Sequence, residues 1–228
     1  AVSGSVASAG LTGISGFTAT VSNISIGVNR GTNAAALDWS TAVEYDDANG
    51  VAFGDVVDPG RYLDPSEDLS ITFTGELFEA SGAIELAIDG FFEASGQFAF
   101  STRTVNVEVA AGDTLTDADL VLLAASQLNG TVGAGGVGFS ISGGSLAVAQ
   151  ISHDVDPRTF TAARGRLGTA QLTGIPGITA TATDLLFELN QGSADVLDWG
   201  AAVDLDASDG LGYGDTVDPG QLLPTPED

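Results

Sequence analysis

Alternating apolar and polar residues mark the middle of the chain as a run of β-strands. From Phe78 to Ile88, apolar or small side chains occupy every second position, and Glu79, Ser81 and Glu85 are among the residues between them. The same period of two returns from Phe92 to Phe100 and again from Val105 to Val109. This period is typical of strands that bury one face and expose the other.

The connections between these segments predict how the strands pair. A three-residue loop after Ile88 places Ile88 opposite Phe92. It also places Leu86 opposite Ala94, so both apolar sets share one face. A second turn at Thr102-Arg103 would continue the pattern into the next strand. The sequence therefore predicts an antiparallel meander.

One local repetition favours a different arrangement of the same strands. The segment from Leu77 to Gly82 nearly recurs from Phe91 to Gly96, and equal spacing suits parallel stacking in a β-solenoid. We predict an all-β fold of antiparallel meander sheets forming a sandwich or barrel-like repeat, with a β-solenoid as the alternative. At most one or two short helices are expected. The best helix candidate starts at Thr116, an N-cap residue followed by Asp117 and Asp119.

A long-range recurrence organises the chain as a whole. The ten-residue segment from Leu11 returns from Leu172 with eight of its ten residues identical, at an offset of 161, and two later motifs return at an offset of 160. The matching motifs are Leu37-Asp38-Trp39 with Leu197-Asp198-Trp199, and Val57-Asp58-Pro59-Gly60 with Val217-Asp218-Pro219-Gly220. We predict that 1–65 is the C-terminal part of one repeat of about 160 residues and that 66–228 is the complete following repeat. Repeat arrays are usually scaffolds or spacers.

Charge narrows the classes of partner. Thirty-one acidic residues face six arginines, giving a formal net charge of −25. Such a surface repels nucleic acid and anionic lipid and attracts cations. It is typical of a highly soluble protein, of a saline habitat or of cation sites. The absence of cysteine excludes disulfides and thiolate metal sites. No apolar run approaches the ~18 residues of a membrane helix, so no membrane insertion is expected.

Each copy carries an acidic loop that is the best candidate for a metal site. Calcium prefers six to eight oxygen ligands, often on a glycine-containing loop. The candidate ligands are Glu44, Asp46, Asn49, Asp55 and Asp58 in the first copy, and Asp204, Asp206, Asp209, Asp215 and Asp218 in the second. The spacing departs from the EF-hand. Acidic turn residues that cap strands are the alternative explanation.

Other candidate residues have mainly structural interpretations. Val57-Asp58-Pro59-Gly60 predicts a type II turn. Trp39 and Trp199 are expected to plug a core beneath the loop, with a sugar-stacking platform as the alternative. His153 is the chain's one histidine, and a surface or turn role is expected. Glu79 and Glu93 could form a glycosidase-like pair, but solvated acids are the expected role. No catalytic residue is assigned.

The motifs resemble those of a known class of proteins. Leu-Thr-Gly-Ile-x-Gly-x-Thr-Ala-Thr, Phe-Glu-Ala-Ser-Gly-x-Phe-Ala-Phe and Gly-Val-Gly-Phe-Ser-Ile-Ser-Gly are similar in style to tandem repeats of giant bacterial extracellular and surface proteins of adhesin-like character. This resemblance implies a β-rich, acidic, cell-surface or extracellular protein, with calcium bound at repeat junctions in many members.

We therefore expect a structural repeat of a long extracellular fibre, stalk or adhesin that stacks head-to-tail with like repeats and is stiffened by calcium, not an enzyme. Its partners would be neighbouring repeats of the same protein, or other copies in a filament, and calcium is the one expected cofactor. The alternative is an extracellular module that binds a glycan or another cell-surface ligand. A secreted hydrolase is the third hypothesis.

Overall fold

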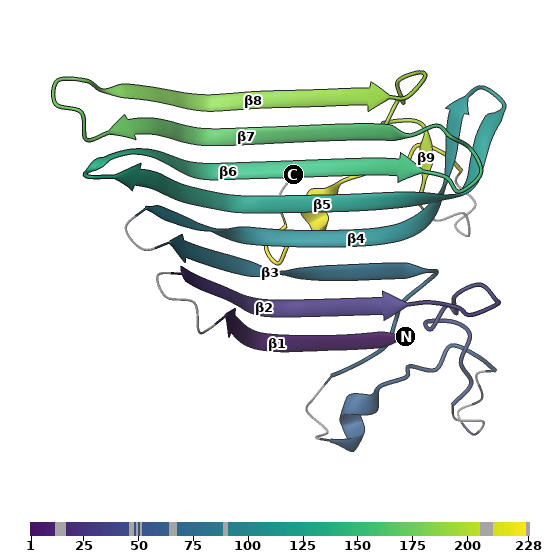
Figure 1. The fold of residues 1–228 in the computed structure, drawn as a ribbon. Helices are drawn as coiled ribbons and strands as arrows, with labels where there is room; N and C mark the ends of the chain where they lie inside the picture. The colour runs from purple at the N-terminus through teal and green to yellow at the C-terminus, as the bar shows by residue number, and fades with distance from the viewer. Residues whose placement is uncertain are drawn as a thin grey trace.

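The chain forms one antiparallel β-sheet in which eight long strands lie side by side in the order of the sequence (Figure 1). The computed structural model describes residues 1–11, 17–45, 48, 50, 52–63, 68–88, 91–205 and 212–226. The strands are β1 (Val2–Leu11), β2 (Phe17–Asn29), β3 (Leu77–Ile88), β4 (Phe92–Ala110), β5 (Asp113–Ala134), β6 (Val137–Ser152), β7 (Phe160–Thr173) and β8 (Ala180–Gly192). A ninth strand, β9 (Val203–Asp204), pairs with β4.

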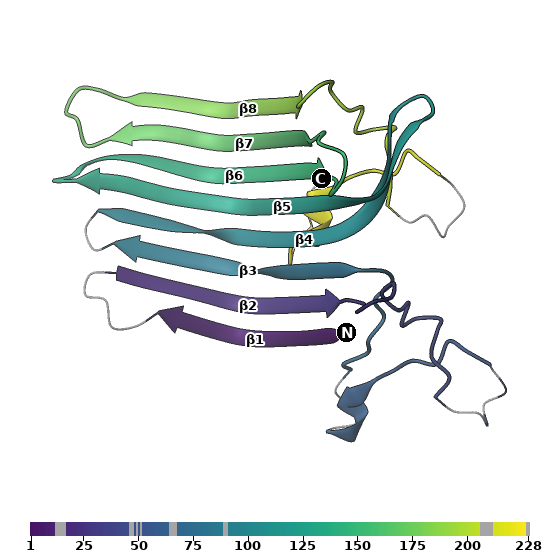
Figure 2. The same cartoon turned by 45° about the vertical axis from the view of Figure 1, so that its right-hand side comes forward.

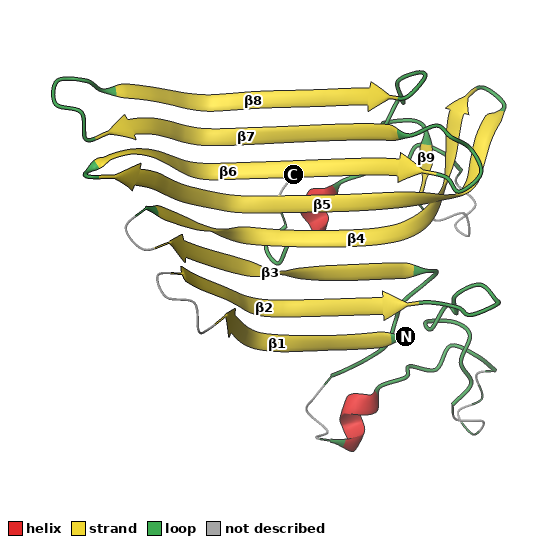
Figure 3. Ribbon diagram, viewed as in Figure 1, coloured by secondary structure: helices red, strands yellow, loops and turns green. Residues whose placement is uncertain are grey.

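Two short 3-10 helices are the helical elements of the described residues (Figure 3). They are η1 (Pro59–Tyr62) and η2 (Pro219–Leu222), and the carboxylates of Asp58 and Asp218 accept the N–H groups of Gly60 and Gly220. The predicted type II turn is therefore wrong, because Pro59 and Gly60 begin a 3-10 helix and Gly60 lacks the positive φ of that turn. Neither helix, nor any other in the described part, is long and apolar enough to cross a membrane.

The predicted all-β meander is confirmed, including the register of its best hairpin. Ile88 pairs with Phe92 and Leu86 pairs with Ala94. The expected closure into a sandwich or barrel-like repeat does not occur, because the described strands form a single open sheet. The solenoid alternative is wrong as well, since every neighbouring pair of strands is antiparallel.

Two local predictions, a turn and a helix, are wrong because both segments are strands of the sheet. Thr102-Arg103 forms no turn, because β4 continues through both residues and pairs with β5. The helix expected at Thr116 is also wrong, because this segment lies inside β5. Leu120 is fully buried there between strands β4 and β6, which stabilises the strand more than the N-cap pattern stabilises a short helix.

The main core lies at one end of the sheet, beneath the segment that follows β8. Figures 1 and 2 show this segment passing over β4, β5 and β6, and η2 contacts all three strands. The buried apolar side chains of this core are Val105, Val107, Leu115, Ala118, Leu120, Leu122, Ala149, Ile151, Phe160, Leu197, Ala202 and Val203. The covering segment and the strands beneath it thus share one hydrophobic core.

The two faces of the sheet differ in cover. On β5, Leu122 faces the covering segment and is 5% exposed, whereas Leu123 points to the other face and is 36% exposed. That other face is also apolar, with Phe78 and Phe100 in edge-to-face contact at 6.0 Å between ring centres. The period of two thus predicts two faces, and among the described residues the segment after β8 covers only one of them.

Candidate functional site

The sequence recurrence is also a recurrence of structure. Strands β1 and β2 pair in the same register as β7 and β8: Val2 faces Val28, and Ala163 faces Leu189, both 161 residues further on. The irregularity recurs too. Asn23 has a φ of 51° in β2, and Asp184, its equivalent in β8, has a φ of 53°. Non-glycine residues rarely adopt this conformation, so its repetition marks a conserved local design within the chain.

Each repeated strand pair ends in the same side-chain cap. In the first copy, Asn29 donates through Nδ2 to the carbonyl of Leu37 at 2.8 Å and accepts from Trp39 Nε1 at 3.0 Å. In the second copy, Asn190 donates to the carbonyl of Leu197 at 3.0 Å and accepts from Trp199 Nε1 at 3.2 Å. An asparagine at the end of the strand thereby fixes the tryptophan and the start of the following loop.

The loops after these caps also match in detail. In the first loop, the amides of Gly54 and Asp55 donate to the carbonyl of Val43, and in the second the amides of Gly214 and Asp215 donate to the carbonyl of Val203. One carboxylate oxygen of Asp55 accepts the N–H of Tyr45 at 2.8 Å. The corresponding oxygen of Asp215 accepts the N–H of Leu205 at 2.7 Å. The acidic residues therefore hold two loops of one design.

The structure places six of the ten proposed calcium ligands. Asp55, Asp58, Asp215 and Asp218 each accept backbone N–H bonds, Glu44 is half-buried, and Asp204 is buried in β9. The other four, Asp46, Asn49, Asp206 and Asp209, lie outside the described residues, as does the predicted repeat boundary between residues 65 and 66. Within the described ranges, no group of three acidic or histidine side chains is arranged to hold a metal ion.

The surroundings of the two loops differ sharply. The second-copy loop, defined as residues 197–223, lies on the sheet: β9 pairs with β4, and the N–H of Glu108 donates to the carbonyl of Ala202 at 2.8 Å. Leu223 packs with Ala99 and Ala124 in a small separate core. This loop is therefore joined to the sheet by backbone pairing and by apolar packing.

The first-copy loop, defined as residues 37–63, lies away from β4–β6 and carries exposed apolar side chains. Leu37 is 43% exposed where Leu197 is 2% exposed, and Leu63 is 81% exposed where Leu223 is 5% exposed. Figure 1 shows the first-copy loop beyond the β1 end of the sheet, on the opposite side of β1 and β2 from the other strands. The same design is thus docked in one copy and undocked in the other.

The first copy instead shows how the chain enters the next strand. The segment leading to β3 covers its cap, because Asn29 Nδ2 donates to the carbonyl of Gly75 at 2.7 Å and the N–H of Trp39 donates to the carbonyl of Phe73 at 2.8 Å. Asn29 is 1% exposed, while Asn190 is exposed. The cap is therefore covered by the following segment in the first copy, whereas in the second copy the asparagine stays exposed and the loop is docked on the sheet.

The histidine occupies a turn, as the sequence predicts. His153 Nδ1 accepts the N–H groups of Val155 and Asp156 just after β6. Beside it, Arg158 bonds Asp156 at 2.8 Å and Asp113 at 2.6 Å. The hydrogen bonds from the guanidinium lower the pKa of Asp156 to about 2 and also lower the pKa of Asp113. This cluster ties the β6–β7 connection to the start of β5.

The proposed glutamate pair does not meet. Glu79 pairs with Ser101 and Glu93 pairs with Ala87, so the two glutamates are separated by about eight residues, or roughly 26 Å, along the strands. Paired catalytic carboxylates of glycosidases lie within about 10 Å. The separation removes these two residues as a catalytic pair.

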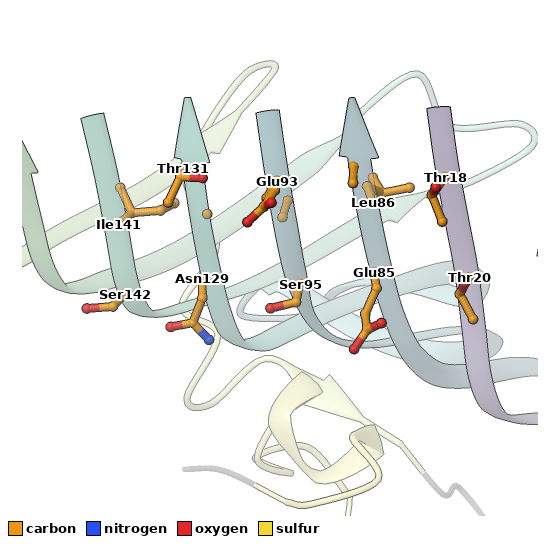
Figure 4. A pocket seen from close by; sticks show the side chains of 13 residues that line it. Thr18, Thr20, Glu85, Leu86, Glu93, Ser95, Asn129, Thr131, Ile141 and Ser142 are labelled. Atoms are coloured by element: carbon orange, nitrogen blue, oxygen red, sulfur yellow. The ribbon is translucent and has the colours of Figure 1, made fainter. Parts of the chain in front are cut away.

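A shallow hollow lies on the sheet face at the end away from the core (Figure 4). Its labelled side chains rise from β2 to β6 and are mostly hydroxyl, amide and carboxylate groups, among them Thr20, Glu85, Glu93 and Asn129. Both glutamates are exposed, and the described lining contains no aromatic side chain. The hollow therefore lacks the aromatic platform expected of a sugar site.

Comparison with protein-family models, curated protein sequences and solved structures finds no match. The residues that sequence reasoning missed are Asn29 and Asn190. Both lie inside the recurring segments, at an offset of 161, so the recurrence itself could have identified them.

Proposed function

We propose that this chain is a structural repeat of a long extracellular fibre, stalk or adhesin, in which like units continue one antiparallel sheet edge to edge. The observation that carries this proposal is the identical register of β1–β2 and β7–β8, six strands apart in the same sheet. A unit that recurs within a continuous sheet can be added again without new kinds of contact.

The edges of the sheet support the same conclusion. Among the described strands β1 pairs only with β2, although its equivalent β7 pairs with both β8 and β6. In the same described part of the chain β8 pairs only with β7, although its equivalent β2 pairs with both β1 and β3. β1 contains ten residues with no charge and no proline. Proteins normally protect such an edge, so an unprotected one is suited to pairing with another strand.

The surface chemistry supports an extracellular location and a cation requirement as parts of the proposal. The charge of −25 keeps a long assembly soluble by mutual repulsion and attracts cations. The resemblance to surface-protein repeats supports the location. We propose calcium as the cation for the acidic loops, because their side chains offer the oxygen ligands that it prefers.

The test is to measure the length of chains with one, two and three copies of residues 69–228 added in tandem. Six strands spaced about 4.8 Å apart add roughly 29 Å per unit along the sheet. Small-angle scattering and electron microscopy should show one particle that lengthens by this step. Separate beads on flexible connections, or a constant maximum dimension, would contradict a continuous sheet.

A further inference from the structure

We propose that the first-copy loop docks onto a further copy of the surface formed by β4, β5 and β6, placed ahead of β1. This inference rests on the proposed function and names the partner surface within it. The second-copy loop shows the docked state. This loop follows β8 and pairs with β4, which lies four strands before β8 in the sheet. Because β2 is the equivalent of β8, the corresponding surface for the first-copy loop lies beyond β1, outside these eight strands.

The first-copy loop retains the side chains that make the docked contacts. The buried residues Leu197, Ala202, Val203 and Leu223 have identical equivalents 160 residues earlier, namely Leu37, Ala42, Val43 and Leu63. The two loops also have equal length between these residues. A loop that faced solvent in the assembled protein would have no physical need for apolar side chains at these same positions.

The backbone of the first-copy loop is suited to the same docking. In the second copy, Val203 pairs with Val107 and Asp204 pairs with Asn106, so the loop adds a short strand to β4. Val43 and Glu44 occupy the equivalent places and lie outside any described strand. Docking on a further β4 would give the backbone at Val43 and Glu44 the hydrogen bonds that Val203 and Asp204 have.

Pairing of β1 with a further copy of β6 would place the proposed docking surface within reach of the first-copy loop. β7 pairs with β6 so that Ala147 faces Arg164 and Leu146 faces Gly165. A further β6 in the same register would face Ser3 and Gly4 of β1. The strands equivalent to β5 and β4 would then follow in order, and the first-copy loop would lie over them as the second-copy loop lies over β4–β6.

A loop-swap chain tests whether the first-copy loop fits the surface. Residues 197–223 are replaced by the sequence of residues 37–63, which has the same length. The swapped chain should melt within a few degrees of the original. Introducing Leu63→Asp into the transplanted loop should then lower the melting temperature by about 5–15 °C, as Leu223→Asp should in the original chain. A swapped chain that melts as low as Leu223→Asp would overturn the proposal.

An extended chain tests whether the native first-copy loop docks. Residues 69–161 are placed directly ahead of Ala1, which keeps the repeat in phase because Ala162 is the equivalent of Ala1. In the original chain, Leu63→Asp should change the melting temperature by less than about 2 °C, since Leu63 is already exposed. In the extended chain the same substitution should cost as much as Leu223→Asp. An unchanged small effect would overturn the proposal.

The two proposals fail in distinguishable ways. Loop docking alone would be contradicted if the tandem chains lengthen by the expected step but Leu63→Asp does not change the melting temperature of the extended chain. Chains that gain the Leu63 effect without lengthening would contradict the continuous sheet alone. A concentration-dependent dimer of the original chain that Leu63→Asp abolishes would place the docking surface in a second molecule, which would also overturn the proposal.

Discussion

The indole nitrogen of Trp39 donates to the amide oxygen of Asn29 at 3.0 Å, and the equivalent bond joins Trp199 to Asn190 at 3.2 Å. The bond is therefore present in both copies although the burial of the asparagine differs, since Asn29 is buried and Asn190 is exposed. This makes the cap part of the repeat itself, and it offers a matched pair of sites for mutation.

Replacing the buried asparagine should cost more than replacing the exposed one. Asn29→Ala leaves Trp39 Nε1 and the carbonyls of Leu37 and Gly75 without their partner, at a cost of about 1–3 kcal/mol. Asn190→Ala should cost less than about 1 kcal/mol, because water can replace the amide. Chemical denaturation monitored by tryptophan fluorescence measures both. Equal losses would show that burial does not control the strength of the cap.

The two faces of β5 should respond differently to truncation. Leu120→Ala should cost about 2–5 kcal/mol, because Leu120 is fully buried in the main core. Leu123→Ala, three residues later on the other face, should cost about 1 kcal/mol. Denaturant midpoints compare the two variants. A larger loss at Leu123 would indicate that the other face is covered in solution.

A glycine at the end of each repeated strand pair should tolerate no side chain. A Cβ atom at Gly192 would lie 1.7 Å from the carbonyl oxygen of Asp195, and one at Gly31 would lie 2.1 Å from that of Ala34. Each alanine variant should lose about 1–3 kcal/mol through overpacking. Gly4→Ala is the control, because open space surrounds Gly4. Thermal melts should leave this control within about 0.5 kcal/mol of the parent.

The Arg158 cluster should make stability depend on acidic pH. The pKa of Asp156 is about 2 in the folded chain, below its ordinary value of 3.8. The folded state therefore gains stability that is fully present above about pH 4 and is lost as the pH falls through 2. Arg158→Gln should lower the melting temperature at pH 6, and its difference from the parent should shrink as the pH approaches 2.

Arg166→Gln is the control for this pH profile. Arg166 bonds Asp184 at 2.9 Å, but both side chains are well exposed, so solvent screens the pair. The variant should follow the parent across the same pH range. A gap between Arg158→Gln and the parent that stays constant down to pH 2 would contradict a role for the ionised Asp156.

Calcium should raise the melting temperature if it binds the folded acidic loops. A ligand at one hundred times its Kd stabilises the folded state by about 2.7 kcal/mol, which is several degrees for a chain of this size. Melts at low ionic strength should compare calcium with chelator. Asp215→Asn keeps a hydrogen-bond acceptor for Leu205 while removing the charge, so it should weaken the response. Identical melts with calcium and chelator would exclude the site.

The sequence could predict those features of the fold that depend on neighbouring strands joined by short loops. The alternation from Glu76 to Phe100 indicates both the strands and their register, because a shift by one residue would reverse every side chain. The N-cap residue Thr116, followed by Asp117 and Asp119, predicts a helix. That prediction is wrong because an N-cap pattern reflects only the local preference of the segment. At Asp117 the chain instead takes a φ of 59° at a register shift between β4 and β5.

The docking of the second-copy loop could not be predicted in the same way. Its contacts join Val203 to Val107 and Leu223 to Ala124, about 100 residues apart in the chain. Nothing in the local pattern of either segment specifies the other. The recurrence showed that Leu37 and Leu197 are equivalent, but their different burial depends on the strands next to each copy.

The number of strands that separates β1 from β7 has a consequence for any assembly. The sheet is antiparallel, and β7 is six places from β1, an even number, so both strands run in the same direction and present the same face. Successive units of the proposed assembly would thus be related without inversion, by translation and a constant rotation. An assembly built this way is polar, with one end like β1 and the other like β8. Growth and capping at the two ends would therefore require different partners.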